Sequence, residues 1–242
     1  MPLNSTRGAG SAKGFGLTSG GGGPDVTIEF LVVAAGGGGP QNQGGRGGGG
    51  GGFRSTTQTL KAGEVVTITV AGATPARAGS GRYAGPAGSN SSVIGNKTLA
   101  SFLATGGGGG GGGSSESAGN SGGSGGGGSP AGSGNAGGFS PSEGNPGGSS
   151  TGGGAGAPGD SGGAGASNAI TGSPVTYAAG SSGSIAGNVG NGGTAGNGGD
   201  GGRVILSIPT EFYSGTTTGS PAVSTSGSNT ILQYTASGTY TV

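Results

Sequence analysis

The sequence contains no cysteine and no histidine in its 242 residues. Without cysteine there can be no disulfide bonds or thiol chemistry, and without either residue most transition-metal sites lose their ligands. Tryptophan is absent too, and only 7% of the residues are charged, with a formal net charge of +1. Such a balance offers no basic surface for nucleic acid and no acidic surface for cations. Backbone hydrogen bonds and modest apolar packing must therefore hold the fold together.

Long apolar runs are also missing. No segment approaches the roughly 20 apolar residues of a membrane span. The first residues, MPLNSTRGAGSAKGFG, lack the apolar core of a signal peptide. We therefore expect a protein that is made in the cytoplasm and is not exported by the usual route.

Glycine is the residue in excess, with 73 of 242 positions, and it is densest at about 36–52 and about 106–168. Three structures compete for these regions. A collagen helix requires glycine at every third position, and SSESAGNS at 114–121 breaks that period. A flexible Gly/Ser linker is compatible with the composition. So is a bundle of polyproline-II-like strands, in which only glycine permits the close approach that satisfies every backbone group.

Alternating apolar residues predict β-strands. In VTIEFLVVA, one face holds Val26, Ile28, Phe30 and Val32, and the other holds Thr27, Glu29, Leu31 and Val33. In EVVTITVA, Val66, Ile68 and Val70 face together. Further strands are expected at 92–95, 98–104 (which could also form a short helix), 174–178, 203–208, 231–235 and 238–242. The sequence predicts an all-β fold with essentially no α-helix: a β-sandwich-like domain with glycine-rich loops or a polyproline-II bundle.

Several predicted strands lead directly into glycine runs. VTIEFLVVAA enters one run, TLASFLAT enters the run Gly106–Gly113, and VTYAAG enters a third. Glycine has no side chain to fix the register of a bundle, so the strands would have to supply it. We therefore expect each such strand to anchor a glycine run, and we expect residues 106–168 to be largely ordered.

Motifs that resemble enzyme or ligand sites are isolated in this chain. PGDSGG at 158–163 matches the surroundings of a trypsin-like serine, but Ser161 has no histidine base, and Lys13, Lys61 and Lys97 lie in no partner motif. GNGGDGG at 196–202 resembles one calcium β-roll repeat, yet Asp200 and Asp160 stand alone. GGRGG around Arg46 is a single triplet, too little for RNA binding. The carboxylates are scattered, so we predict no enzymatic activity, no cofactor, no metal site and no nucleic-acid partner.

Over most of its length the sequence resembles glycine-rich structural proteins of tailed bacteriophages, especially tail-fibre-like and virion proteins of marine cyanophages. The order of the elements is the specific part of the resemblance. The segments are STRGAGSAKGFGLTSG (5–20), DVTIEFLVVAAGGGGP (25–40), GGGGGGFRST (47–56), VVTITVAGA (65–73), SNSSVIGN with LASFLATGGGGGGGG (89–113), ITGSPVTYAAG (170–180) and GGDGGRVILSIP (198–209).

Two departures from that family pattern bear on the domain organisation. TILQYTASGTYTV closes this chain, whereas in the family a similar strand precedes the first one. We therefore expect it to pair with residues 25–33 of the same or a neighbouring chain, and its alternation around Ser237-Gly238 is hairpin-like. The region 114–165 is also richer in Ser, Asn and Pro than pure glycine blocks. We predict an attachment segment at 1–24, a glycine-rich β domain at 25–209 with its bundle at about 106–168, and a C-terminal β extension at 210–242.

The resemblance implies a non-enzymatic virion protein on the tail or capsid surface, assembled in the host cytoplasm with other virion proteins, and a homo-oligomer. Bundle-bearing phage adhesins present loops at the bundle tip, so the loops here are expected to contact a bacterial surface saccharide or outer-membrane protein. The receptor-contact candidates are Phe139 with Asn135, Glu143 and Asn145, and Phe139 could instead plug a small apolar cluster. The virion-attachment candidates are Arg7, Lys13 and Phe15. A purely architectural virion protein and a disordered glycine-rich protein are the alternatives.

Overall fold

The structure, a computed structural model, describes residues 23–40, 46–77, 83–112, 118–161, 163–181, 189–194 and 196–242. The virion-attachment candidates Arg7, Lys13 and Phe15 lie outside the described residues. No helix in the described ranges is long and apolar enough to cross a membrane. The only helical elements described are two 3-10 turns, η1 (Gly159–Ser161) and η2 (Thr210–Phe212).

Eleven strands form three antiparallel sheets, so the predicted all-β class is confirmed. Sheet A has five strands in the order β2-β1-β8-β10-β9, and sheet B has four in the order β11-β3-β4-β5. β6 and β7 form a third, two-stranded sheet. The strands are β1 (Val26–Val33), β2 (Phe53–Leu60), β3 (Val65–Thr69), β4 (Ser91–Gly95), β5 (Phe102–Ala104), β6 (Ala166–Asn168), β7 (Val175–Tyr177), β8 (Arg203–Pro209), β9 (Ala222–Ser226), β10 (Asn229–Tyr234) and β11 (Gly238–Thr241).

Sheets A and B pack face to face as a β-sandwich, and the alternation in β1 explains why. Its residues Val26, Ile28, Phe30 and Val32 lie in one buried cluster with side chains from both sheets, including Val66 and Ile68 of β3, as predicted. Leu31 and Val33 point the other way, into a second cluster that contains Tyr177 of β7 and Ile205 of β8. Strand β1 is thus buried on both faces for much of its length, which accounts for its nearly continuous apolar run.

The C-terminal strands take different partners from those predicted. β10 pairs with β8 and β9, not with β1, because β8 lies between them in sheet A. β11 does not form a hairpin with β10, because it crosses to sheet B and pairs with β3. Both predictions were therefore wrong, although the segment does return to the sandwich within the same chain. The change of sheet places Tyr234 and Tyr240 in the same core cluster.

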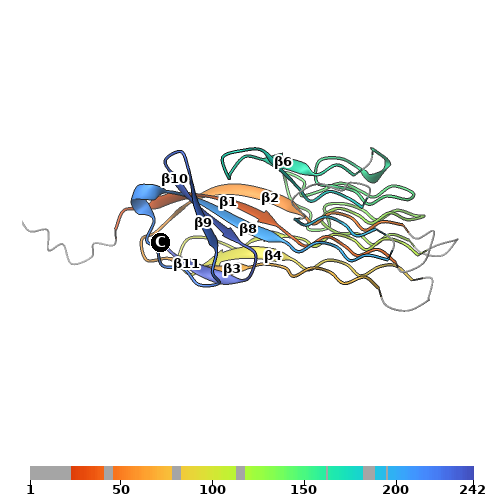
Figure 1. Cartoon of the computed structure of the whole chain (residues 1–242), viewed down its shortest axis with the longest axis horizontal. Helices are drawn as coiled ribbons and strands as arrows, with labels where there is room; N and C mark the ends of the chain where they lie inside the picture. Colours follow the sequence, from red (N-terminus) through yellow and green to blue (C-terminus); the bar gives the residue numbers. More distant parts are fainter. Residues whose placement is uncertain are drawn as a thin grey trace, which may run out of the picture.

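The glycine-rich segments continue from the strands as a bundle of thin, roughly parallel paths that extends away from the sheets (Figure 1). The C-terminal end of the chain lies at the sheet end of the molecule (Figure 1). We call the junction of bundle and sandwich the inner end of the bundle, and the side away from the sheets its outer end. The bundle draws on segments well outside 106–168, including residues 34–39, 46–52 and 189–194.

Candidate functional site: the glycine lattice and its two ends

Residues 46–52 show how the bundle is held together. Their N–H groups donate to three neighbouring segments in turn, and the same segment recurs at every third residue. The bonds run from Arg46 to Gly111, Gly47 to Ser150, Gly48 to Gly193, Gly49 to Gly108, Gly50 to Gly153, Gly51 to Gly190 and Gly52 to Thr105, at 2.7–3.0 Å between N and O. A β-strand, whose period is two, reaches only two neighbours. A period of three is that of polyproline II.

The carbonyl groups of the same segment face three further neighbours. They accept hydrogen bonds as follows: Gly47 from Gly127, Gly48 from Ser181, Gly49 from Gly37, Gly50 from Ser124 and Gly52 from Ala34. Three segments accept hydrogen bonds from residues 46–52 and three other segments donate hydrogen bonds to them, so residues 46–52 are surrounded by six neighbours. We call this arrangement the glycine lattice. A polyproline-II strand has no internal hydrogen bonds, so the lattice supplies the partners that its backbone groups require.

Residues 34–39, which follow β1 directly, repeat the pattern. Their N–H groups donate from Ala34 to Gly52, Ala35 to Ser89, Gly36 to Asp200, Gly37 to Gly49, Gly38 to Pro86 and Gly39 to Asn197. Each of the three neighbours recurs after three residues, with its numbering decreasing, so all three run antiparallel to this segment. β1 therefore passes into the lattice without a turn, as the anchoring hypothesis predicted. The register of β1 with β2 continues in the bond from Ala34 to Gly52.

Close approach of the backbones explains why the lattice residues are glycine. A Cβ atom added to Gly50 would lie 2.3 Å from the carbonyl oxygen of Ala178, and one on Gly51 would lie 2.1 Å from that of Ala34. At Gly107 the nearest atom would be the carbonyl oxygen of Gly49, at 2.2 Å. These obstacles are backbone atoms, so they cannot turn aside as the end of a flexible side chain could.

The inner end of the lattice is closed by a cluster around Arg54 of β2. Its guanidinium carbon lies 3.7 Å from the ring centroid of Phe139 and 4.3 Å from that of Phe102. The same guanidinium donates to the carbonyl oxygen of Leu103 at 2.7 Å. Burial lowers the pKa of Arg54, and the nearby Glu143 carboxylate acts in the opposite direction. The cluster joins β2, β5 and the loop 136–143.

Glu143 is buried and fully engaged with backbone groups. One carboxylate oxygen accepts from the N–H of Thr105 at 2.8 Å and the other from that of Gly137 at 3.2 Å. Asn135 folds the same loop, since its amide both donates to and accepts from the backbone of Phe139. Asn145 donates to the carbonyl oxygens of Gly154 and Ala155 in the next segment.

The four receptor-contact candidates are thus brought together, but at the inner end of the bundle and not at its tip. The loop 136–143 lies beside β2, as the bond from Phe53 N–H to Glu143 C=O shows. Here the ring of Phe139 lies against the guanidinium of Arg54. Receptor contact by this cluster stays a prediction, and its side chains already have partners within the chain.

An exposed aromatic residue that the sequence analysis missed lies toward the outer end. Tyr83 is 64% exposed, and the guanidinium carbon of Arg77 lies 4.8 Å from its ring centroid. Arg77 also donates to the carbonyl oxygen of Ala84 at 3.2 Å. The bonds from Gly88 to Gly107 and from Gly85 to Gly110 show that this segment approaches the sheets as its numbering rises. Tyr83 precedes Gly85 and so lies farther out. The sequence feature that could have pointed to Tyr83 as a contact residue is that it is an aromatic residue in a polar, glycine-rich stretch.

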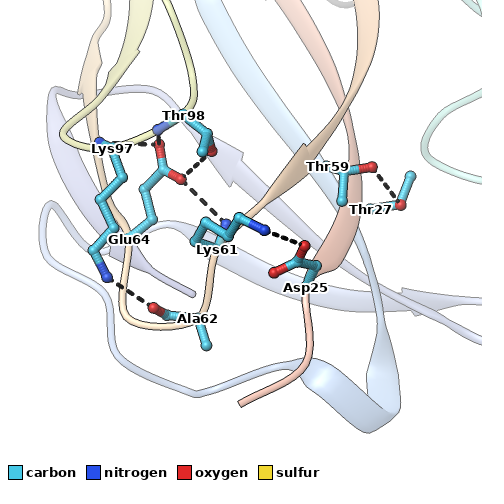
Figure 2. Close-up of polar contacts among 8 residues, drawn as sticks. All are labelled: Asp25, Thr27, Thr59, Lys61, Ala62, Glu64, Lys97 and Thr98. Atoms are coloured by element: carbon cyan, nitrogen blue, oxygen red, sulfur yellow. Dashed lines mark hydrogen bonds and ion pairs between the residues drawn. The ribbon is translucent and has the colours of Figure 1, made fainter. Parts of the chain in front are cut away.

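At the opposite end of the molecule, the turn between β2 and β3 holds the buried residue Glu64 (Figure 2). Its carboxylate accepts from the N–H groups of Thr98 and Leu99 at 2.9 and 2.8 Å, from the Thr98 hydroxyl, and from the N–H of Lys61 at 3.3 Å. Burial alone would raise the pKa of Glu64, but these hydrogen bonds outweigh burial and lower it to about 2. Glu64 therefore ties the β2–β3 turn to the loop before β5.

The remaining motif and the lysines considered as its partners make contacts that hold the fold together. In PGDSGG, Asp160 accepts from the N–H of Ser149 and Ser161 belongs to the turn η1. Lys61 pairs with Asp25 at 2.6 Å and Lys97 donates to the carbonyl of Ala62, both at the Glu64 turn (Figure 2). Within the described ranges, no group of three acidic residues is placed to hold a metal ion.

Comparison with known proteins gives one result. A family model described as a glycine-rich domain matches residues 24–239. No curated protein and no solved structure matches the chain. The matched range takes in the described lattice segments and the strands of the sandwich except the end of β11.

Proposed function

The chain belongs to the glycine-rich domain family, and on that premise we propose that it is a non-enzymatic structural protein of a phage virion, a tail fibre, spike or adhesin. Its sandwich would join it to other virion proteins and to further copies of itself. The outer end of its lattice would face a bacterial surface saccharide or outer-membrane protein. We place the protein in a virion because the order of its segments resembles that of phage virion proteins.

The observation that carries the proposal is the six-neighbour lattice around residues 46–52. Each neighbour restrains the segment through backbone bonds, so bending one strand would break bonds to several others. A stiff body made almost without side chains has little chemistry of its own along its length. Such a body suits the task of holding its end loops at a distance from the sandwich.

At the outer end, Tyr83 is the exposed aromatic residue to which we assign contact. Aromatic rings stack on the apolar faces of sugars, and a neighbouring guanidinium donates hydrogen bonds to hydroxyl or carboxylate groups. Arg77 already holds one face of the ring, while the large exposed fraction of Tyr83 leaves room for a ligand. This assignment moves the predicted contact from Phe139 to Tyr83.

The test compares two aromatic residues at opposite ends of the molecule. Tyr83→Ser should weaken binding of the purified protein to intact bacteria of the producing host by at least about tenfold, as expected for loss of one buried aromatic contact. Phe212→Ser, at the partly exposed Phe212 of η2, is the matched control and should bind as the parent does. Equal binding by both variants would contradict the assignment.

A purely architectural role in the virion is the second candidate. The small number of large apolar side chains that are exposed among the described residues favours it, since these are Tyr83, Ile94, Phe212 and Val223. Immuno-gold labelling of intact particles separates the two roles. Label at the distal tail supports an adhesin, label on the capsid supports an architectural protein, and particles without label would contradict both.

A further inference from the structure

Strand β9 (Ala222–Ser226) is an open edge of sheet A. It pairs with β10 on one side, and no other described strand pairs with its outer side. Four of its five residues are exposed, including Val223 at 54%. An edge strand offers a row of unpaired N–H and C=O groups to any other strand.

Two of the other sheet edges, β11 and β2, differ from the edge at β9. The free side of β11 is covered by residues 216–218, through bonds from Thr218 to Thr239 and from Thr241 to Thr216. β2 carries Arg54, whose side chain reaches across to Leu103 of β5. By contrast β9 carries no charge, and the sequence has no Asp, Glu, Lys or Arg anywhere after Glu211. Charged residues are a common device against edge-to-edge pairing, and here they are missing.

The hairpin geometry shows which groups of β9 face outward. Ser226 and Asn229 flank the two-residue turn at Gly227-Ser228, where Gly227 has a φ of 57°. In such a turn the first residue accepts from the last, so Ser226 faces β10. Because antiparallel pairs alternate, Val223 and Thr225 direct their N–H and C=O groups to the free edge. Pro221 precedes the strand and has no N–H to donate, which confines any ladder to residues 222–226.

We propose that β9 binds the β9 strand of a second copy of this chain, antiparallel to it, about a two-fold axis at Ser224. That register uses the whole strand. Val223 then lies opposite the partner's Thr225, and each such pair exchanges both of its hydrogen bonds. A two-fold axis makes the contact self-complementary and closed, so the assembly stops at a dimer. The two copies together form one continuous sheet.

Val223 exposes apolar surface at this edge, and covering the edge would bury that surface. It pairs with Leu232 of β10, so its side chain lies on the same face of the sheet as that core residue. Leu232 is fully buried, whereas Val223 is not. The second copy would place its Thr225 beside Val223 and remove apolar surface from water.

This inference rests on the proposed homo-oligomer and specifies the contact between its copies. It is tested by the mass of the protein in solution and not by binding to bacteria, so the dimer and the proposed host contact can fail separately. The full chain should sediment at twice its mass of 21.6 kDa. Val223→Lys/Thr225→Lys places like charges opposite one another and should raise the dissociation constant by about 100-fold. Val223→Lys/Thr225→Glu pairs opposite charges across the axis in the same register and should restore the dimer.

The matched control places the same charges on the other edge of the sheet. Ser55 and Thr57 of β2 are exposed, and Ser55→Lys/Thr57→Lys should leave the mass at that of the dimer. Circular dichroism of every variant checks that the sandwich is intact. A monomeric parent chain, a dimer that survives Val223→Lys/Thr225→Lys, or a dimer that is lost only on the β2 change would each overturn the proposal.

Discussion

At the residue scale, glycine in the lattice is required by the carbonyl groups that surround it. Gly50→Ala should lower the free energy of unfolding by about 3 kcal/mol or more, since overpacking typically costs about 1–3 kcal/mol even where neighbours can yield. The nearest obstacle is the backbone carbonyl of Ala178, which would lie 2.3 Å from the added Cβ. Urea unfolding followed by circular dichroism measures the change.

Gly72 supplies the control for this substitution. An added Cβ there would meet nothing within 4 Å. Gly72→Ala should therefore be neutral or stabilise by up to about 1 kcal/mol, because alanine restricts the unfolded chain more than glycine does. Similar losses in both variants would mean that glycine acts through backbone flexibility and not through close approach.

Glu64 gives the molecule a pH dependence of defined sign. In the unfolded chain its pKa is near the ordinary 4.5, and in the folded chain it is about 2. Its contribution is therefore complete above about pH 4.5 and is lost as the pH falls toward 2. The size of the shift corresponds to a contribution on the order of 3 kcal/mol. Thermal unfolding across this pH window should show the loss.

Glu64→Gln removes that pH dependence and should destabilise the protein at neutral pH by a similar amount, on the order of 3 kcal/mol, because an amide cannot accept all of these hydrogen bonds. Glu211→Gln makes the same change of charge at an exposed glutamate in the turn η2, and it should leave the melting temperature unchanged. A pH profile of Glu64→Gln that still falls between pH 4.5 and 2 would assign the acid sensitivity to other groups.

At the scale of elements, the strands that could be predicted were those in which apolar and polar residues alternate. The alternation in β1 and β3 predicted which residues share a face, and the core confirms it. β2 was not predicted as a strand, because FRSTTQTL is mostly polar and half of its residues are exposed. Its place is fixed by pairing along the whole of β1. β9 escaped notice for the same reason, as a polar strand fixed by its hairpin with β10.

The C-terminal elements bind the two sheets together, although the sequence suggested a hairpin. Alternation in 229–242 shows which residues are buried, but it does not show that the chain changes sheets between Tyr234 and Gly238. Deleting residues 229–242 should abolish cooperative unfolding. The deletion removes the buried side chains Ile231, Leu232, Tyr234 and Tyr240, worth about 1.5–3 kcal/mol each, from a total stability of about 5–15 kcal/mol.

Thermal melting and sedimentation of the truncated chain test this. Unchanged melting together with an unchanged mass would identify the segment as a tail. A loss of dimer with normal melting would instead mean that the segment serves association alone, as β9 is proposed to do.

At the scale of the whole molecule, the direction of each lattice strand decides what lies at which end. The sequence pointed to Phe139 because it is a bulky residue in a glycine-rich region. It could not show that residues 132–136 run back toward the sheets, a direction set by bonds such as Asn135 to Gly123. Glycine runs carry no side-chain pattern from which direction or neighbours can be inferred. The lattice was therefore predictable in kind, and the positions of its loops were not.

The same lack of side chains leads to a prediction about cooperativity. Most hydrogen bonds of the lattice join backbone groups, with few from side chains such as Asn145. Residues 34–39 and 46–52 continue directly from β1 and into β2. If the sandwich sets the register, opening the sandwich must also release the glycine amides. Leu232→Ala, at a fully buried position of β10 that no lattice bond touches, should cost about 2–5 kcal/mol. Hydrogen exchange should then show the same loss of protection at Gly48–Gly51 as at Phe30 and Leu206. Unchanged protection of the glycine amides, with faster exchange in the strands alone, would mean that the lattice is a separate folding unit. It would then hold its own register without the sandwich.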